Sequence, residues 1–102
     1  MVEDDELVFD WDPSKAASNL AKHGVAFEEA TTVFRDEHAL LLADPEHSED
    51  EDRFVLLGLS QEIRVLVVCH CFREEEELLR IISARRANPL ERRQYAEKMQ
   101  KP

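Results

Sequence analysis

Arg53-Phe-Val-Leu-Leu-Gly-Leu59 and Arg64-Val-Leu-Val-Val-Cys-His-Cys-Phe72 are two apolar runs separated by a short polar segment, Ser60-Gln-Glu62. Runs of seven to nine residues rich in Val and Leu, with polar residues between them, are typical of neighbouring strands. This stretch therefore predicts a hairpin of two antiparallel strands, and the rest of the chain is expected to build around it.

The segments that follow this hairpin extend the sheet and then leave it. The four glutamates at 74–77 form a second connection, and residues 78–85 are expected to be the next strand. Asn88-Pro89-Leu90-Glu91 combines an N-cap, a first-turn proline and a glutamate at the third position, and so predicts a final helix that begins here. Because few apolar residues follow, this helix is expected to dock loosely or to rest on a partner.

The segments before the hairpin predict a strand at 7–11, two helices and a short strand at 39–43. Asp12-Pro13 opens the first helix and Gly24 ends it, whereas Ala26 is a poor N-cap for the second helix, at 27–34. The acidic segment 44–52 reads as a loop. The element order predicts an α+β fold in which a strand and two helices precede a four-strand, mainly antiparallel sheet and a C-terminal helix. We expect one domain over residues 1–102, with 1–6 and 99–102 flexible.

Charge is distributed unevenly along the 102 residues. The net charge is −10, yet residues 78–102 hold seven Lys or Arg against two Glu, a net of +5. A negative protein repels nucleic acid as a whole, but charges beyond about 10 Å are largely screened at physiological salt. The basic C-terminal region is therefore a candidate anion site, unless its arginines simply pair with neighbouring carboxylates.

Several classes of protein are disfavoured by the composition. No apolar run approaches the ~20 residues of a membrane span, and the acidic residues 1–6 do not resemble a secretory signal. Cys69 and Cys71 are too close on one strand to bridge, which favours reduced thiols and a cytoplasmic location. A single mid-strand pair is not a zinc pattern, and two glycines cannot form a Gly-rich phosphate loop. We expect neither metal nor cofactor.

Two histidines are candidates for proton transfer. Strand alternation places His70 with Leu66 and Val68, and it places Arg85 with Ser83 but opposite Arg80. His70 near Arg85 would set an acid or base beside a phosphate binder, although a lone histidine at a strand end is also explained by capping or solvation. His23, with Lys22, ends the first helix, where cations complement the helix dipole and where an imidazole could also transfer protons.

A family resemblance rests on motifs that occur in order along the chain: Phe9-Asp-Trp-Asp-Pro-Ser-Lys15, Lys22-His-Gly-Val-Ala-Phe-Glu-Glu-Ala30 and Arg80-Ile-Ile-Ser-Ala-Arg-Arg86, then Glu91-Arg92 and Tyr95. The sequence resembles the BrnT family of type II toxins. The resemblance implies a fold similar to RelE-type ribonucleases and metal-independent RNA cleavage that halts translation. It also implies a BrnA-like ribbon-helix-helix antitoxin, through which alone the protein would contact operator DNA.

The resemblance and the residue chemistry together give a set of candidate site residues. Expected catalytic residues are Lys22, His23, Arg53, His70, Arg85 and Tyr95; expected RNA-binding residues are Arg64, Arg86 and Arg92. Guanidinium groups suit phosphate oxygens, and an imidazole suits the base or the acid. Two departures from the family are Ala26 in place of a common serine and the glutamates at 74–77, where Gly and basic residues are usual. The alternatives are a catalytically weak module that binds an antitoxin-like DNA-binding protein and modulates its repression, or a small-anion-binding protein.

Overall fold

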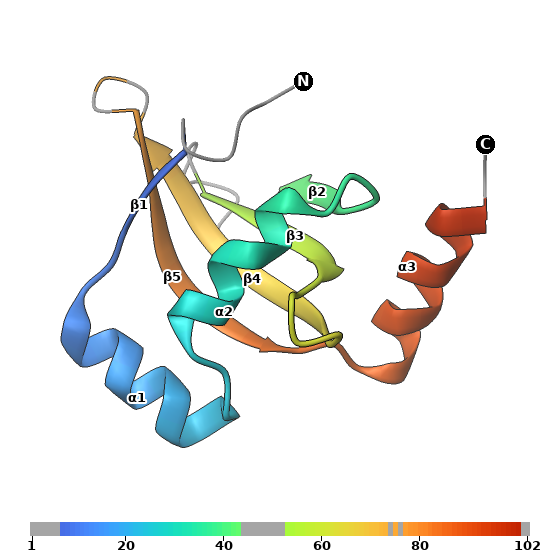
Figure 1. The fold of residues 1–102 in the computed structure, drawn as a ribbon, viewed down its shortest axis with the longest axis horizontal. Helices are drawn as coiled ribbons and strands as arrows, with labels where there is room; N and C mark the ends of the chain where they lie inside the picture. The colour runs from blue at the N-terminus through green and yellow to red at the C-terminus, as the bar shows by residue number, and fades with distance from the viewer. Residues whose placement is uncertain (1–6, 44–52, 74, 76, 101–102) are drawn as a thin grey trace.

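The computed structural model describes residues 7–43, 53–73, 75 and 77–100, which form one mixed sheet with three helices around it (Figure 1). The strands are β1 (Val8–Asp10), β2 (Leu40–Ala43), β3 (Arg53–Leu59), β4 (Val65–Arg73) and β5 (Leu78–Arg86). The helices are α1 (Pro13–His23), α2 (Phe27–Thr32), continued by the 3₁₀ turn η2 (Val33–Arg35), and α3 (Pro89–Gln100). The prediction of an α+β fold is confirmed.

The sheet has the strand order β1-β5-β4-β3-β2. The strands β2 to β5 are antiparallel to one another, and they include the predicted hairpin of β3 and β4. The five predicted strands are all present, but the expected four-strand sheet has a fifth strand, because β1 pairs in parallel with the start of β5, Val8 opposite Leu78 and Asp10 opposite Arg80. A three-residue segment carries too little pattern to reveal a partner seventy residues away.

The predicted start and end of α1 are confirmed, and each is fixed by a residue at the helix terminus. Asp12 caps α1 by accepting a hydrogen bond from the Ser14 backbone N–H at 2.8 Å, and Gly24 ends the helix in the left-handed region at φ +69°. Ala26 gives α2 no side-chain cap, as its chemistry dictates. Of the segments expected to be flexible, Met99 and Gln100 belong to α3, whereas 1–6 and 101–102 lie outside the described residues, as does the acidic segment 44–52.

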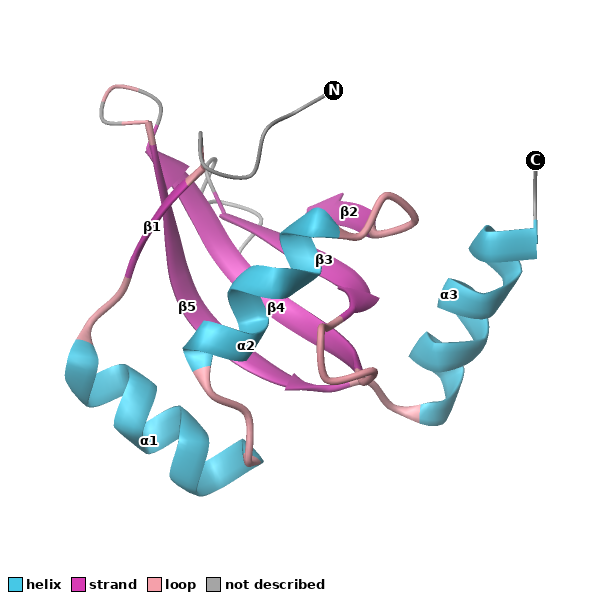
Figure 2. Ribbon diagram, in the orientation of Figure 1, coloured by secondary structure: helices cyan, strands magenta, loops and turns pink. Residues whose placement is uncertain are grey.

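The main core lies between one face of the sheet and the helices α1 and α2, which cover that face in Figure 2. Its buried side chains come from β3, β4, β5, α2 and the residues around α2: Val25, Phe27, Ala30, Val33, Leu56, Leu66, Val68, Ile81 and Ala84. Gly58 permits the close approach of η2, since a Cβ there would lie 2.8 Å from Val33 Cγ1 and 2.9 Å from Ala39 Cβ. We call this face of the sheet the helix face.

Asn19 joins three segments of the fold from inside this core. Its amide Nδ2 donates to the carbonyls of Val25 (2.9 Å) and Ala84 (2.8 Å), and its Oδ1 accepts from the Ala84 N–H at 3.1 Å. The side chain is buried, so these three backbone groups have no water to replace it. Asn19 therefore fixes α1 and the following loop against β5.

The opposite face of the sheet, which we call the second face, is covered at one corner by α3. There Tyr95 packs with Leu57, Val67 and Ala87 in a smaller buried cluster. Tyr95 is the only buried residue of α3, while Leu90 and Met99 on the same helix are 60% and 47% exposed. None of the helices described here is long and apolar enough to cross a membrane.

Candidate nucleic-acid interface

A row of cross-strand neighbours on the second face joins two arginines. In the strand register Arg53 lies opposite Cys71, Cys71 opposite Arg80, and Arg80 opposite Asp10. Residues directly opposite one another share a face of the sheet. Arg53 and Arg80 are therefore brought to the same end of the second face from segments 27 residues apart in sequence.

A β-bulge in β5 adds a third arginine to this face. Cys69 pairs with Ser83 but the next residue, His70, pairs with Ile81, so that Ile82 is an extra residue without its own partner. Strict alternation predicted Arg80 and Arg85 on opposite faces, and that prediction was wrong. Because the bulge shifts the alternation by one residue, both arginines lie on the second face, roughly 13 Å apart along the strand at ~3.3 Å per paired residue.

Arg85 is held by a carboxylate from the first turn of α3. Its Nη1 donates to Glu91 Oε1 and its Nη2 to Oε2, each at 2.8 Å, which is the bidentate geometry that a guanidinium also offers to phosphate. These hydrogen bonds from Arg85 lower the pKa of Glu91, as does a further bond from the Asn88 N–H. Sequence analysis gave Glu91 only a capping role, so this partner of Arg85 was missed.

Arg80, which was not among the expected site residues, also has a carboxylate partner on this face. Its Nη2 lies 3.0 Å from Asp10 Oδ2, and both side chains are partly exposed, at 36% and 41%. The Arg80 Nε is buried and donates to no acceptor in the part of the chain that the structure describes. A buried donor without an acceptor is costly.

His70 lies on the helix face and not beside Arg85. It is 3% exposed and packs edge-on against Phe34, with ring centroids 4.9 Å apart, while its Nδ1 lies 3.3 Å from the Val68 carbonyl. Burial lowers the pKa of His70, and the Val68 contact offsets this only in part. The expected pairing of this imidazole with Arg85 was therefore wrong, because the two side chains occupy opposite faces.

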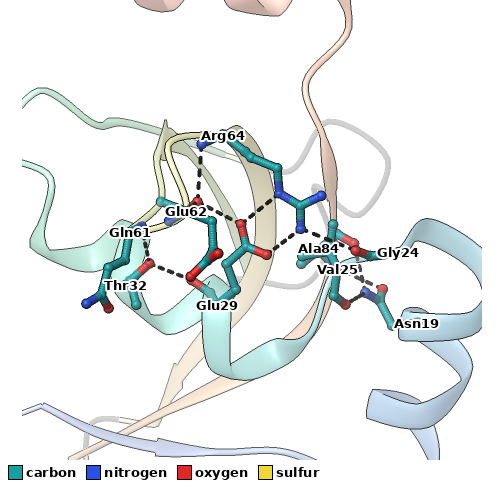
Figure 3. A network of polar contacts seen from close by, with 10 residues as sticks. Asn19, Gly24, Val25, Glu29, Thr32, Gln61, Glu62, Arg64 and Ala84 are labelled. Atoms are coloured by element: carbon teal, nitrogen blue, oxygen red, sulfur yellow. Dashed lines mark hydrogen bonds and ion pairs between the residues drawn. The ribbon is translucent and has the colours of Figure 1, made fainter.

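Arg64, expected to bind RNA, is instead part of an internal network (Figure 3). Its guanidinium makes two hydrogen bonds to Glu29, one of them from Nε at 3.0 Å, and a third to the Gly24 carbonyl at 3.2 Å. Glu29 also accepts from the Ser60 hydroxyl at 2.7 Å and is only 9% exposed. The bonds from Arg64, and then that from Ser60, lower the pKa of Glu29. Arg64 thus ties the β3–β4 turn to the ends of α1 and α2.

The remaining expected residues lie in three places. Lys22 and His23 are exposed at the end of α1, one residue from the carbonyl that Arg64 uses. Arg86 is exposed and pairs with Leu66, a core residue of the helix face, in the strand register. Arg92 donates from Nη1 to the Ala87 carbonyl at 2.9 Å and so braces the start of α3.

Tyr95 holds α3 against the sheet. Its hydroxyl donates to Asp36 Oδ2 at 2.5 Å, and burial followed by this carboxylate raises the tyrosine pKa well above its ordinary value. Burial alone would raise the pKa of Asp36, but bonds from the Leu59 N–H, Tyr95 and the His38 N–H lower it. The phenol is therefore a buried anchor in this structure, and it is poorly placed to stack on a base or to donate a proton.

The expected site residues do not converge on one pocket. The second face collects Arg53 and Arg85 and adds Arg80, whereas the two expected histidines lie elsewhere. No group of three His, Cys, Asp or Glu suited to hold a metal ion occurs among the residues that the structure describes. What the second face offers is a set of guanidinium groups, of which Arg80 and Arg85 contact Asp10 and Glu91, on a surface that one helix covers at a corner.

These features define a small α+β protein with one helix-covered sheet face and one arginine-bearing face. A family model described as "Ribonuclease toxin, BrnT, of type II toxin-antitoxin system" matches residues 11–91, and the chain belongs to this family. The fold is similar to the crystal structure of the Brucella abortus ribonuclease toxin BrnT, with a TM-score of 0.63 and 24% identity over 80% of this chain and 97% of that one. No curated protein matches the sequence.

Proposed function

We propose that this protein is an endoribonuclease toxin that cleaves RNA without a metal ion, inhibits translation in the cytoplasm, and is neutralised by a BrnA-like ribbon-helix-helix antitoxin. Membership of a ribonuclease toxin family supports the activity, and it implies an RNA substrate and an antitoxin partner. The observation that carries the proposal for the site is the gathering of Arg53, Arg80 and Arg85 on the second face.

The chemistry that these arginines can supply is charge stabilisation. Cleavage of RNA through its 2′-hydroxyl passes through a phosphorane that bears more negative charge than the substrate, so fixed guanidinium groups stabilise it more than the ground state. Arg85 presents two parallel N–H groups, and Arg80 presents a partly exposed guanidinium group. The second face thus holds cations for the substrate phosphate and for its transition state.

The test combines growth, cleavage and one matched pair of variants. Expression without an antitoxin should arrest growth, and the purified full chain should cleave RNA at low salt in the presence of a metal chelator. Arg85→Ala should slow cleavage by about 10²–10³-fold, as expected for the loss of a donor to the transition state. Arg93→Ala removes the same charge from an exposed position on α3 and should leave the rate unchanged. A wild-type protein that neither arrests growth nor cuts RNA would contradict the proposal.

A second candidate function is favoured by the ion pairs themselves. Arg64, Arg80 and Arg85 each have a carboxylate partner, Glu29, Asp10 and Glu91 respectively, and the net charge is −10. Such a protein could have kept the fold in order to bind an antitoxin-like DNA-binding protein and tune its repression, with little catalysis. Formation of that complex by a chain that leaves RNA intact would select this function over the first.

A further inference from the structure

The turn between β3 and β4, residues 60–64, contains a strained apolar residue. Ile63 has φ +62°, in the left-handed region, and its N–H donates to the Ser60 carbonyl at 2.9 Å. The Ser60 N–H in turn donates to the Arg64 carbonyl at 2.8 Å, which closes the hairpin. This position in a hairpin loop is ordinarily Gly or Asn, because a β-branched side chain is strained there.

Side-chain packing against the described residues does little to offset this strain. The Ile63 side chain is 81% exposed, the most exposed of the large apolar side chains in the described part of the chain. The sequence therefore places an isoleucine where it is strained and where its burial contributes almost nothing to stability. Backbone strain of this kind persists at binding sites, where the strained residue makes its contacts with something outside the chain.

The surroundings of Ile63 are rigid and acidic. The Gln61 N–H donates to Thr32 Oγ1 at 2.8 Å, and the Ser60 hydroxyl donates to Glu29, so that the turn is fastened to α2 (Figure 3). Between the turn and α2 lies a hollow of about 590 Å³. Three carboxylates and one guanidinium line it: Glu28, Glu29, Glu62 and Arg64. Arg64 is bonded to Glu29, and the exposed Glu28 and Glu62 add further negative charge to the rim.

We infer that residues 60–64 and the hollow beside them form the docking surface for the antitoxin. In the complex, Ile63 enters an apolar pocket of the antitoxin that is surrounded by Lys or Arg side chains. The inference rests on the proposed function in that it takes the family's antitoxin as the partner. Ile63 follows Glu62, which lines the acidic hollow, so an exposed apolar anchor stands beside a group of carboxylates. An apolar anchor next to charged groups is typical of an interface hot spot, and the carboxylates would steer a basic partner toward it. Arg53 and Arg80 lie at the far ends of β3 and β5, and Arg85, although it pairs with Val67 near the turn, lies on the second face. The hollow lies instead against α2, so docking and RNA binding can be tested by separate mutations.

The decisive variant is Ile63→Gly, because stability and binding should change in opposite directions. Relief of the left-handed strain should raise the thermal midpoint of the isolated toxin by about 4 °C or more, whereas loss of the anchor should weaken binding of the antitoxin from the same operon at least tenfold. Ile63→Leu, which keeps the apolar bulk, should retain most of the affinity. Glu28→Gln with Glu62→Gln should slow association and make it less dependent on salt.

Leu90→Ala is the matched control, since Leu90 is also an exposed apolar residue, 60% exposed, but lies on α3. The affinity of the wild-type chain and of each variant for the purified antitoxin is measured by titration calorimetry. Nuclease activity is measured separately, with RNA and without the antitoxin. Unchanged affinity of Ile63→Gly, or a larger loss for Leu90→Ala, would overturn the assignment of this surface while the proposed function stands. Failure of the wild-type chain to bind the antitoxin would instead remove the proposed partnership and the docking surface with it.

Discussion

Replacing Glu91 with glutamine should lower the stability of the protein and raise its affinity for RNA. The Glu91 carboxylate accepts two hydrogen bonds from Arg85 and one from the Asn88 N–H, the last at 2.9 Å to Oε1. Glutamine has the same size and keeps one carbonyl oxygen, so the cap of α3 survives. The charge and one of the two acceptors for Arg85 are lost.

The expected loss of stability and the expected gain in RNA affinity both depend on how exposed the Arg85–Glu91 ion pair is. The Arg85 side chain is 43% exposed and that of Glu91 22%, so that solvent screens their attraction. A pair of this kind contributes about 1 kcal/mol, which is the expected loss in the free energy of unfolding. An RNA phosphate that binds Arg85 must displace the carboxylate at a similar cost. Removing that cost should tighten RNA binding about fivefold, since 1.4 kcal/mol corresponds to a factor of ten.

Fluorescence anisotropy with a short RNA whose 2′-hydroxyls are methylated measures binding without cleavage, and urea unfolding followed by the single Trp11 measures stability. Glu97→Gln makes the same change of charge at an exposed position of the same helix and reports the general effect of one carboxylate fewer. Equal gains in affinity for the two variants would refute the specific competition between Glu91 and phosphate. So would weaker binding by Glu91→Gln.

Three further predictions test the fold around the site. Asn19→Asp should cost about 2–4 kcal/mol in urea unfolding, because the new carboxylate faces two buried carbonyl oxygens that have lost their donor, whereas Ser18→Ala, exposed on the same helix, should change little. Tyr95→Phe should cost about 1–3 kcal/mol by removing the donor to Asp36, and hydrogen exchange should then show α3 opening more readily than the sheet. Because Glu29, like Asp36, has a lowered pKa in the folded state, its stabilising effect is complete above the unfolded value near 4.5 and is lost as pH falls through the folded value. Because the pKa of the buried His70 is also lowered, urea midpoints should begin to fall as the pH drops below the unfolded histidine value near 6.5, and they should fall further below about pH 5 as these carboxylates are protonated; a stability that rises on acidification would contradict this sign.

The parts of the fold that were predicted from sequence depend on local chemistry. Asp12-Pro13 and Gly24 bound α1, and Asn88 with Glu91 caps α3, because each of these devices acts on groups within four residues of itself. The β3–β4 hairpin could be predicted from the sequence for the same reason, since its two strands are adjacent in the chain. Local signals of this kind do not require knowledge of the tertiary structure.

The site was harder to predict because its geometry depends on pairing between distant segments. The bulge at Ile82 has no sequence marker, yet it decides that Arg80 shares a face with Arg85. The partner of Arg64 is 35 residues away, and only the packing of α2 against the β3–β4 turn reveals it. Arg85 and Glu91 were within reach of sequence analysis, since they are six residues apart and Glu91 lies in the first turn of the helix after the strand.

The carboxylate partners of the arginines do not all have the same consequence for RNA. At Arg80 and Arg85 the partners Asp10 and Glu91 are 41% and 22% exposed, and such screened pairs contribute about 0–1 kcal/mol, so a phosphate can replace the carboxylate at little cost. At Arg64 the partner Glu29 is 9% exposed and also accepts from Ser60, so displacing it would leave a buried charge and break a link between α2 and the β3–β4 turn. The Arg80–Asp10 and Arg85–Glu91 pairs therefore orient their guanidinium groups and still allow an anion to bind them. The Arg64–Glu29 pair instead stabilises the fold. The pattern of ion pairs is therefore compatible with the proposal that the second face binds RNA, and Arg64 takes no part in that surface.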